Sequence, residues 1–260
     1  MTTGQPRFTN FTVFLDGLAS EQAVRDAADV CNEVVALQFA DHLVDVSPSV
    51  RAVYEFVDNR HLSSWHEALT QLPKAASVWW EPTGKRDLES LSIHYTGLWG
   101  PELPAAVFDV KAVWSGRRNF VPALNSIMGI GERVTISFGE MGPAGGSAGL
   151  NSRLEHAIRG RIEPLAERVL AGRRTLRGYS WITVCPHEVI AQLGGVGALR
   201  DGGAFWSVSP SFAGGAVLQA TRQIDDFDGD AINRVFSALR PALRGGNPDP
   251  RKAKFLALLR

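Results

Sequence analysis

The chain has 260 residues and a formal net charge of zero, because 27 lysines and arginines balance 27 aspartates and glutamates. An apolar fraction of 45% with 21% charged residues excludes a wholly disordered chain. The neutral balance also lacks the basic excess of polyanion-binding proteins, so no direct nucleic-acid binding is expected.

Targeting signals and membrane spans are not expected from this sequence. The chain does not open with a basic segment followed by an apolar core, and no stretch approaches about 18 uncharged apolar residues. We therefore expect a cytoplasmic protein with no membrane partner. The two cysteines, Cys31 and Cys185, are expected to be reduced and buried.

The N-terminal region predicts one strand and one helix. Residues 8–15 are β-branched and aromatic, and Asp16-Gly17 ends the run. Ser20 then stands where an N-cap belongs, and Glu21 follows in the first turn. The apolar spacing predicts a helix that continues to about Phe39.

The next part of the chain predicts a meander. Residues 50–57 are compatible with a strand or a helix, and residues 62–72 predict a helix. Three further runs predict strands at residues 75–81, 88–96 and 105–115. Short connections between these three favour antiparallel pairing over βαβ units.

A glycine-rich segment divides the sequence. Residues 133–138 predict a strand, and the segment 142–150 is either a linker or a long loop. A helix capped by Asn151 or Ser152 should follow it. These features predict an N-terminal half of residues 1–141 and a C-terminal half of residues 151–260, with one single domain as the alternative.

The last third has a regular pattern. A strand at residues 179–185 is followed by a helix that begins at Pro186 and a short helical turn at residues 198–200. Residues 204–209 and 216–221 predict a hairpin. Asp228 or Asp230 then caps a helix that Pro241 ends.

The order of these elements predicts the fold class. Strands cluster with strands and helices with helices, which favours α+β over alternating α/β. We expect antiparallel sheets with helices packed on one face, and two similar α+β halves are an alternative to one unit.

No catalytic, metal or cofactor motif is found. The histidines and cysteines lack zinc-ligand spacing, and neither a GxxxxGK[ST] nor a GxSxG sequence is present. Counted from Asp226, an EF-hand loop would need glycine and glutamate where Ala231 and Ser237 stand. We therefore predict no catalytic residue, no metal and no cofactor.

Two groups of residues are candidates for partner binding. The acidic residues Asp225, Asp226, Asp228 and Asp230 suit a helix N-terminus, and the alternative is a surface for a basic partner. The pair Trp79-Trp80 lies in a predicted strand, which puts one ring on each face. An exposed tryptophan would indicate an interface.

Residues 179–241 resemble a known family. Tyr-Ser-Trp-Ile-Thr-Val on a strand, a helix closed by Leu193-Gly194-Gly195, the hairpin segment 214–220 and a helix ending in Leu239-Arg240-Pro241 follow in order. This arrangement resembles the C-terminal part of type VI secretion immunity proteins and the immunity-52-like proteins of bacterial polymorphic toxin systems. Where that family is expected to have a Pro- and Gly-containing loop, this chain has the acidic segment 222–230.

The resemblance implies a bacterial α+β protein that binds and blocks a cognate protein toxin. It would occlude the toxin's active site through an interface of about 1,600 Å². Two alternatives remain open. One is an enzyme with dispersed residues, for which His94, Asp109 and His187 are candidates, and the other is a structural subunit of a bacterial assembly. Homo-oligomer formation also stays open.

Overall fold

A computed structural model describes residues 7–15, 20–43, 49–54, 58–62, 75–81, 87–98, 105–115, 119–142, 172–176 and 178–243. The chain divides into two compact units. Unit 1 comprises Met1–Phe11 and Leu15–Val134, and unit 2 comprises Thr12–Phe14 and Thr135–Arg260. The predicted halves meet at residues 142–150, of which 143–150 lie outside the described residues, so that boundary stays a prediction.

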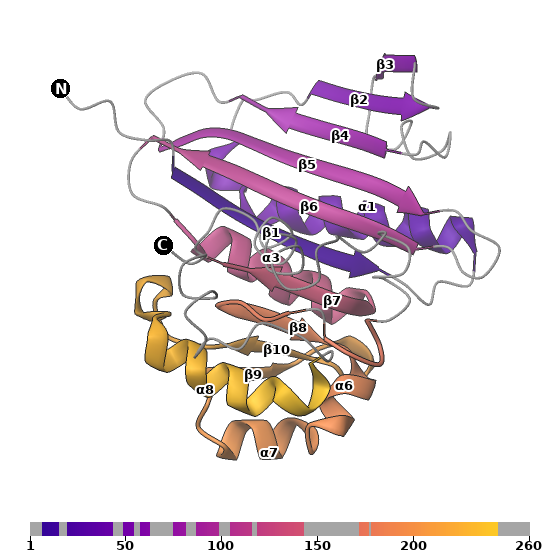
Figure 1. Cartoon of the computed structure of the whole chain (residues 1–260). Helices are drawn as coiled ribbons and strands as arrows, with labels where there is room; N and C mark the ends of the chain where they lie inside the picture. Colours follow the sequence, from indigo (N-terminus) through magenta and orange to yellow (C-terminus); the bar gives the residue numbers. More distant parts are fainter. Residues whose placement is uncertain are drawn as a thin grey trace, which may run out of the picture. The chain divides into compact units, whose positions relative to one another are not determined.

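Unit 1 contains strands with two helices packed together (Figure 1). Its strands are β1 (Arg7–Leu15), of which Thr12–Phe14 belong to unit 2, β2 (Ser49–Tyr54), β3 (Asp58–Leu62), β4 (Ala75–Trp80), β5 (Leu88–Leu98) and β6 (Ala105–Trp114). They lie in the order β3-β2-β4-β5-β6-β1. The antiparallel pairings of β4 with β5 and of β5 with β6 confirm the predicted meander.

The helices of unit 1 are α1 (Glu21–Gln38) and α3 (Val121–Arg133), and the short helix η1 (Ala40–His42) follows α1. The predicted cap of α1 is confirmed, since the Ser20 hydroxyl accepts a hydrogen bond from the Ala23 N–H. Figure 1 shows α1 running along one face of the strands. Beneath it, the indole N–H of buried Trp114 donates to Thr9 Oγ1 at 3.0 Å.

The helix α3 was not predicted from the sequence. Gly129 and Gly131 lower the helix propensity of this segment. Tertiary packing supplies the stabilisation instead, because a Cβ at Gly129 would lie 3.0 Å from Val34 of α1. The helix also ends at Arg133, so the strand predicted from that residue begins three residues later.

Unit 2 contains the remaining elements. Its strands are β7 (Ile136–Met141), β8 (Ile182–Cys185), β9 (Ser207–Pro210) and β10 (Ala216–Gln219). Its helices are α6 (His187–Gln192), α7 (Gly195–Asp201) and α8 (Gly229–Leu239), with the short helices η3 (Phe212–Gly214), η4 (Ile224–Asp226) and η5 (Arg240–Ala242). The strand order is β7-β8-β10-β9.

Antiparallel pairing organises unit 2. β10 pairs with β9, which confirms the predicted hairpin, and it also pairs with β8. Figure 1 shows α8 crossing one face of these strands, and Ile232, Val235 and Leu239 are its buried side chains at helical spacing. These two units give the α+β fold that the sequence predicts.

β8 is shorter than the predicted strand. The Ser180 N–H donates to Thr183 Oγ1 at 3.0 Å, and the Thr183 hydroxyl lies 3.3 Å from the Ser180 carbonyl oxygen. This local turn takes the Ser180 backbone groups out of the ladder, and the strand begins at Ile182. Of the helix predicted at residues 62–72, Leu62 lies in β3 and the rest lies outside the described residues. The helix predicted after residue 151 also lies outside the described residues.

Close packing of β7 on β8 gives a first prediction. A Cβ at Gly139 would lie 3.0 Å from Val184 Cγ2 and 3.1 Å from Val13 Cγ1. We expect Gly139→Ala to lower the free energy of unfolding by about 1–3 kcal/mol, because the neighbours must shift. Urea denaturation followed by circular dichroism measures the change.

Gly229→Ala is the matched control. Gly229 is the first residue of α8, and no heavy atom lies within 4 Å of the Cβ it would carry. The same methyl group there should stabilise the chain by up to about 1 kcal/mol. Equal effects of the two substitutions would contradict the packing explanation.

Candidate functional site

An exposed tryptophan marks a candidate interface in unit 2. Trp206 precedes β9, and its side chain is 60% exposed. Its backbone N–H donates to the carbonyl oxygens of Gln219 at 2.8 Å and of Ala220 at 3.2 Å. The ring is therefore presented to solvent from a fixed backbone position, as is typical of residues that dominate binding energy in interfaces.

An arginine covers this tryptophan. The Arg222 guanidinium carbon lies 5.8 Å from the centroid of the Trp206 ring, which is a cation–π distance. The loop that carries Arg222 is tied down on both sides of that residue. The Thr221 carbonyl accepts from Trp181 Nε1 at 2.8 Å, and the Thr221 hydroxyl donates to the Gln223 carbonyl at 2.6 Å.

The four predicted aspartates follow this loop directly, and all four are exposed. Asp228 is the N-cap of α8 and accepts from the Ala231 N–H at 3.5 Å, while Asp230 lies in the first turn. Capping and the helix dipole explain these two. Asp225 and Asp226 precede α8 and lie in the first turn of the short helix η4. We call Trp206, Arg222, Asp225 and Asp226 the Trp206 surface.

The other predicted partner-binding residues lie in β4 of unit 1. Trp80 is only 6% exposed and belongs to the core. Trp79 pairs with Ser49 and Ser92 in the backbone register, and its side chain lies outside what the structure describes. The partner-binding role of the aspartates and tryptophans stays a prediction. Trp206 was not among the residues predicted from the sequence, because its exposure depends on where β9 begins.

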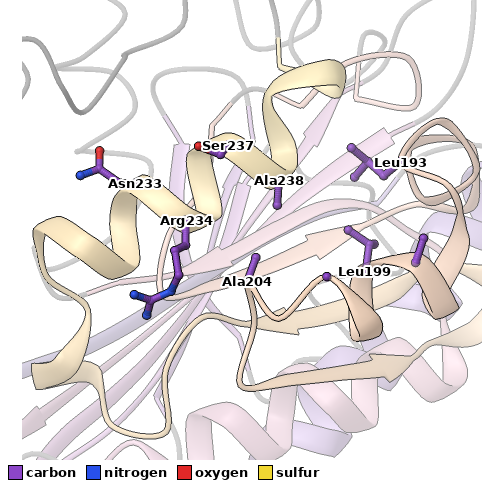
Figure 2. A pocket seen from close by; sticks show the side chains of 9 residues that line it. Leu193, Leu199, Ala204, Asn233, Arg234, Ser237 and Ala238 are labelled. Atoms are coloured by element: carbon purple, nitrogen blue, oxygen red, sulfur yellow. The ribbon is translucent and has the colours of Figure 1, made fainter.

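A groove of about 590 Å³ lies between α7 and α8. Its apolar lining comprises Leu193, Ala198, Leu199, Ala204 and Ala238. Asn233, Arg234 and Ser237 add polar groups from α8. Figure 2 shows Arg234 and Ala238 projecting from one side of the helix, and Asn233 and Ser237 from another. This is the i, i+4 relation on a helix surface.

Two of the three enzyme candidates are brought together. His94 of β5 and Asp109 of β6 are direct cross-strand partners. Burial lowers the pKa of His94 from its ordinary value of 6.5, Asp109 opposes this shift and Lys111 adds to it. His187 belongs to the other unit, where it is the exposed first residue of α6. Together, His94 and Asp109 could hold or move a proton.

Two thiols and one carboxylate are buried in the described part of the chain. Cys31 and Cys185 are buried and form no disulfide, and burial raises the pKa of both thiols. Sequence reasoning passed over Glu140, a carboxylate buried in β7 opposite Thr183. Among the described residues there is no group of three or more metal-ligating side chains. In that same part of the chain, no helix is long and apolar enough to cross a membrane.

Comparison with known proteins identifies a shared fold. No protein-family model matches the chain, and no curated protein matches it. Its structure is similar to that of the Pseudomonas aeruginosa T6SS protein PA0821, with a TM-score of 0.59 and 14% sequence identity. The match covers 100% of this chain and 84% of the other. At this identity the likeness establishes the fold alone.

The His94–Asp109 pair gives a prediction about pH. We expect Asp109→Asn to lower the pKa of His94 further, because a stabilising negative charge is lost, and Lys111→Met to raise it. Histidine proton NMR over a pH titration measures both shifts. Shifts in the same direction for the two variants would contradict this electrostatic arrangement.

The lowered pKa of His94 also determines how the free energy of unfolding changes with pH. Because the pKa of His94 is lower in the folded chain than its ordinary 6.5, the unfolded chain binds the extra proton first. The His94 contribution to stability is therefore complete above pH 6.5 and is lost as the pH falls toward the folded-state pKa. His94→Gln should weaken this pH dependence in urea denaturation series between about pH 5 and 7.

Proposed function

We propose that this chain is a non-catalytic binding protein that neutralises a cognate protein toxin of a bacterial type VI secretion context. The observation that carries the proposal is the Trp206 surface, where an exposed tryptophan held by two backbone hydrogen bonds lies under Arg222. Tryptophan and arginine are the residues most enriched where binding energy concentrates in protein interfaces.

Two further observations support the toxin context. Residues 179–241 resemble type VI secretion immunity proteins, and the Trp206 surface lies inside that segment. A structural neighbour is a T6SS protein of Pseudomonas aeruginosa, and the similarity extends over the whole of this chain. The neighbour contributes the fold and the secretion context, and the immunity role comes from the sequence resemblance.

The mechanism would be steric. A partner that covers Trp206 and Arg222 buries an aromatic anchor, and the exposed Asp225 and Asp226, which follow Arg222 by three and four residues, favour a partner with basic groups near its active site. A standard interface of about 1,600 Å² is enough to occlude a cleft. No chemical step by this chain is needed for such inhibition.

A second candidate function is enzymatic, and the His94–Asp109 pair favours it. Cross-strand partners hold the two groups on one face of the sheet, and burial keeps the imidazole in its neutral, proton-accepting form near pH 7. The binding function is preferred, because the Trp206 surface combines several features of interfaces, while the pair is accompanied by no recognised catalytic motif.

The test begins with affinity capture of the tagged chain from its native host and mass spectrometry of what it retains. We expect one stoichiometric partner that arrests growth when expressed alone and is tolerated when this chain is co-expressed. Recovery of the chain alone, while its genomic neighbours are expressed, would contradict the proposal. A retained protein that is harmless on its own would contradict the toxin role.

Trp206→Ala should then weaken binding of that partner by about 30-fold or more, the size of an interface hot spot. Growth protection should fall in parallel. Leu37→Ala is the control, because it removes another exposed apolar side chain, 68% exposed, from α1. Calorimetry on the purified pair should find less than a twofold change for the control.

A further inference from the structure

Gln219, the last residue of β10, is hydrogen-bonded to both members of the tryptophan–arginine pair. Its backbone carbonyl oxygen accepts from the Trp206 N–H at 2.8 Å. Its side-chain amide nitrogen, Nε2, donates to the Thr221 carbonyl oxygen at 3.0 Å and to the Arg222 carbonyl oxygen at 3.3 Å. One residue therefore contacts the backbone of the tryptophan and the backbone of the arginine that lies over its ring.

The register of the hairpin directs the Gln219 side chain. Gln219 pairs with Ser207 of β9, the residue that follows Trp206. Directly paired residues carry their side chains on the same face of the sheet, and the Ser207 hydroxyl lies 3.4 Å from Gln219 Oε1. The oxygen end of the amide thus faces β9. The nitrogen end faces the loop that carries Arg222, where two carbonyl oxygens require a donor.

The loop that carries Arg222 depends on side chains for its backbone hydrogen bonds. It lies between β10 and η4, in neither a helix nor a strand. The Thr221 carbonyl accepts from Trp181 Nε1 as well as from Gln219, and the Gln223 carbonyl accepts from the Thr221 hydroxyl. Gln219 supplies the hydrogen bond to the arginine itself. The backbone position of Arg222 is therefore linked directly to the Gln219 amide.

Arg222 has a long, exposed side chain, so its position over the ring has an entropic cost. Ordering such a side chain when a partner binds weakens association by about two- to tenfold. In this chain both ends of the side chain are restrained. The Gln219 amide holds the backbone end, and the Trp206 ring lies 5.8 Å from the guanidinium carbon at the other end.

We propose that Gln219 is the positioning residue of the Trp206 surface. Its amide holds the loop so that the Arg222 guanidinium lies over the Trp206 ring before a partner arrives. Arg222 is then ordered during folding and not during binding, which strengthens the association. The consequence for the partner rests on the proposed binding function, whereas the placement of Arg222 is a property of the chain by itself.

The placement of Arg222 is tested by NMR on the isolated full chain. The ring current of Trp206 shifts the Arg222 Hδ and Hε resonances upfield, and Trp206→Ala gives the reference positions without the ring. Gln219→Met removes the amide at similar side-chain length, and it should move these resonances most of the way to the reference. The Trp206 amide resonance should stay in place, because that N–H donates to a backbone carbonyl.

Two further variants separate positioning from a general effect. Gln219→Asn keeps an amide but shortens the side chain by one methylene group, so it should behave like Gln219→Met. Gln192→Met is the matched control, because Gln192 Nε2 donates to the Pro241 carbonyl oxygen at 2.9 Å, outside the loop that carries Arg222. This control should leave the Arg222 resonances unchanged. Retained dispersion of the amide spectrum verifies that each variant is folded.

A double-mutant cycle with the captured partner tests the consequence for binding. Gln219→Met should weaken partner binding about two- to tenfold in the otherwise unchanged chain. In the Arg222→Met background it should weaken binding by less than about twofold, because a residue that acts through Arg222 then has nothing to position. Equal losses in the two backgrounds would show that Gln219 acts independently of Arg222, and would overturn the inference.

Two results on the isolated chain would also overturn the inference. One is an Arg222 shift that Gln219→Met leaves unchanged, and the other is an equal loss of that shift in Gln192→Met. Neither result alters the growth-protection assay. If no toxin is captured, the proposed function fails, while the NMR shifts still decide whether Gln219 positions Arg222. Failure of the positioning role and failure of the toxin role are therefore distinguishable.

Discussion

β10 is the strand on which the described part of unit 2 depends. Its residues pair with β8 on one side and β9 on the other, with Gln219 opposite both Ile182 and Ser207. The carbonyl oxygens of Gln219 and Ala220 then hold Trp206, and that of Thr221 holds the Trp181 indole. Backbone hydrogen bonds therefore place the exposed ring and the loop above it before any partner arrives, which lowers the entropy cost of binding.

The amphipathic pattern of α8 also determines which of its side chains reach the surface. Burial of Ile232, Val235 and Leu239 fixes the rotation of the helix, because those side chains must leave water. Arg234 and Ala238 then project from one side of the helix and line the groove (Figure 2). The same apolar spacing that stabilises the helix thus determines which cation borders the groove. Core packing thus decides which side chains of α8 are exposed.

The two units offer different chemistry. In unit 1 the cross-strand register opposes an imidazole and a carboxylate, an arrangement suited to proton transfer. In unit 2 the exposed groups of the described residues include the Trp206 ring and the Arg222 guanidinium, residue types that are enriched in protein interfaces. A fold shared with a T6SS protein is compatible with either, since folds host unrelated functions and sites decide them.

Local signals in the sequence determined α1 with its Ser20 cap, α8 with its Asp228 cap, the meander of β4, β5 and β6, and the hairpin of β9 and β10. Each depends on periodicity, capping or turn residues that act within a few positions of the chain. Long-range contacts decided the rest. Packing on Val34 makes a helix of the glycine-containing α3, burial removes Trp80 from the surface, and cross-strand register opposes His94 and Asp109. Arg222 lies over the Trp206 ring, and α7 and α8 line one groove, only through the placement of residues distant in sequence, which local patterns do not encode.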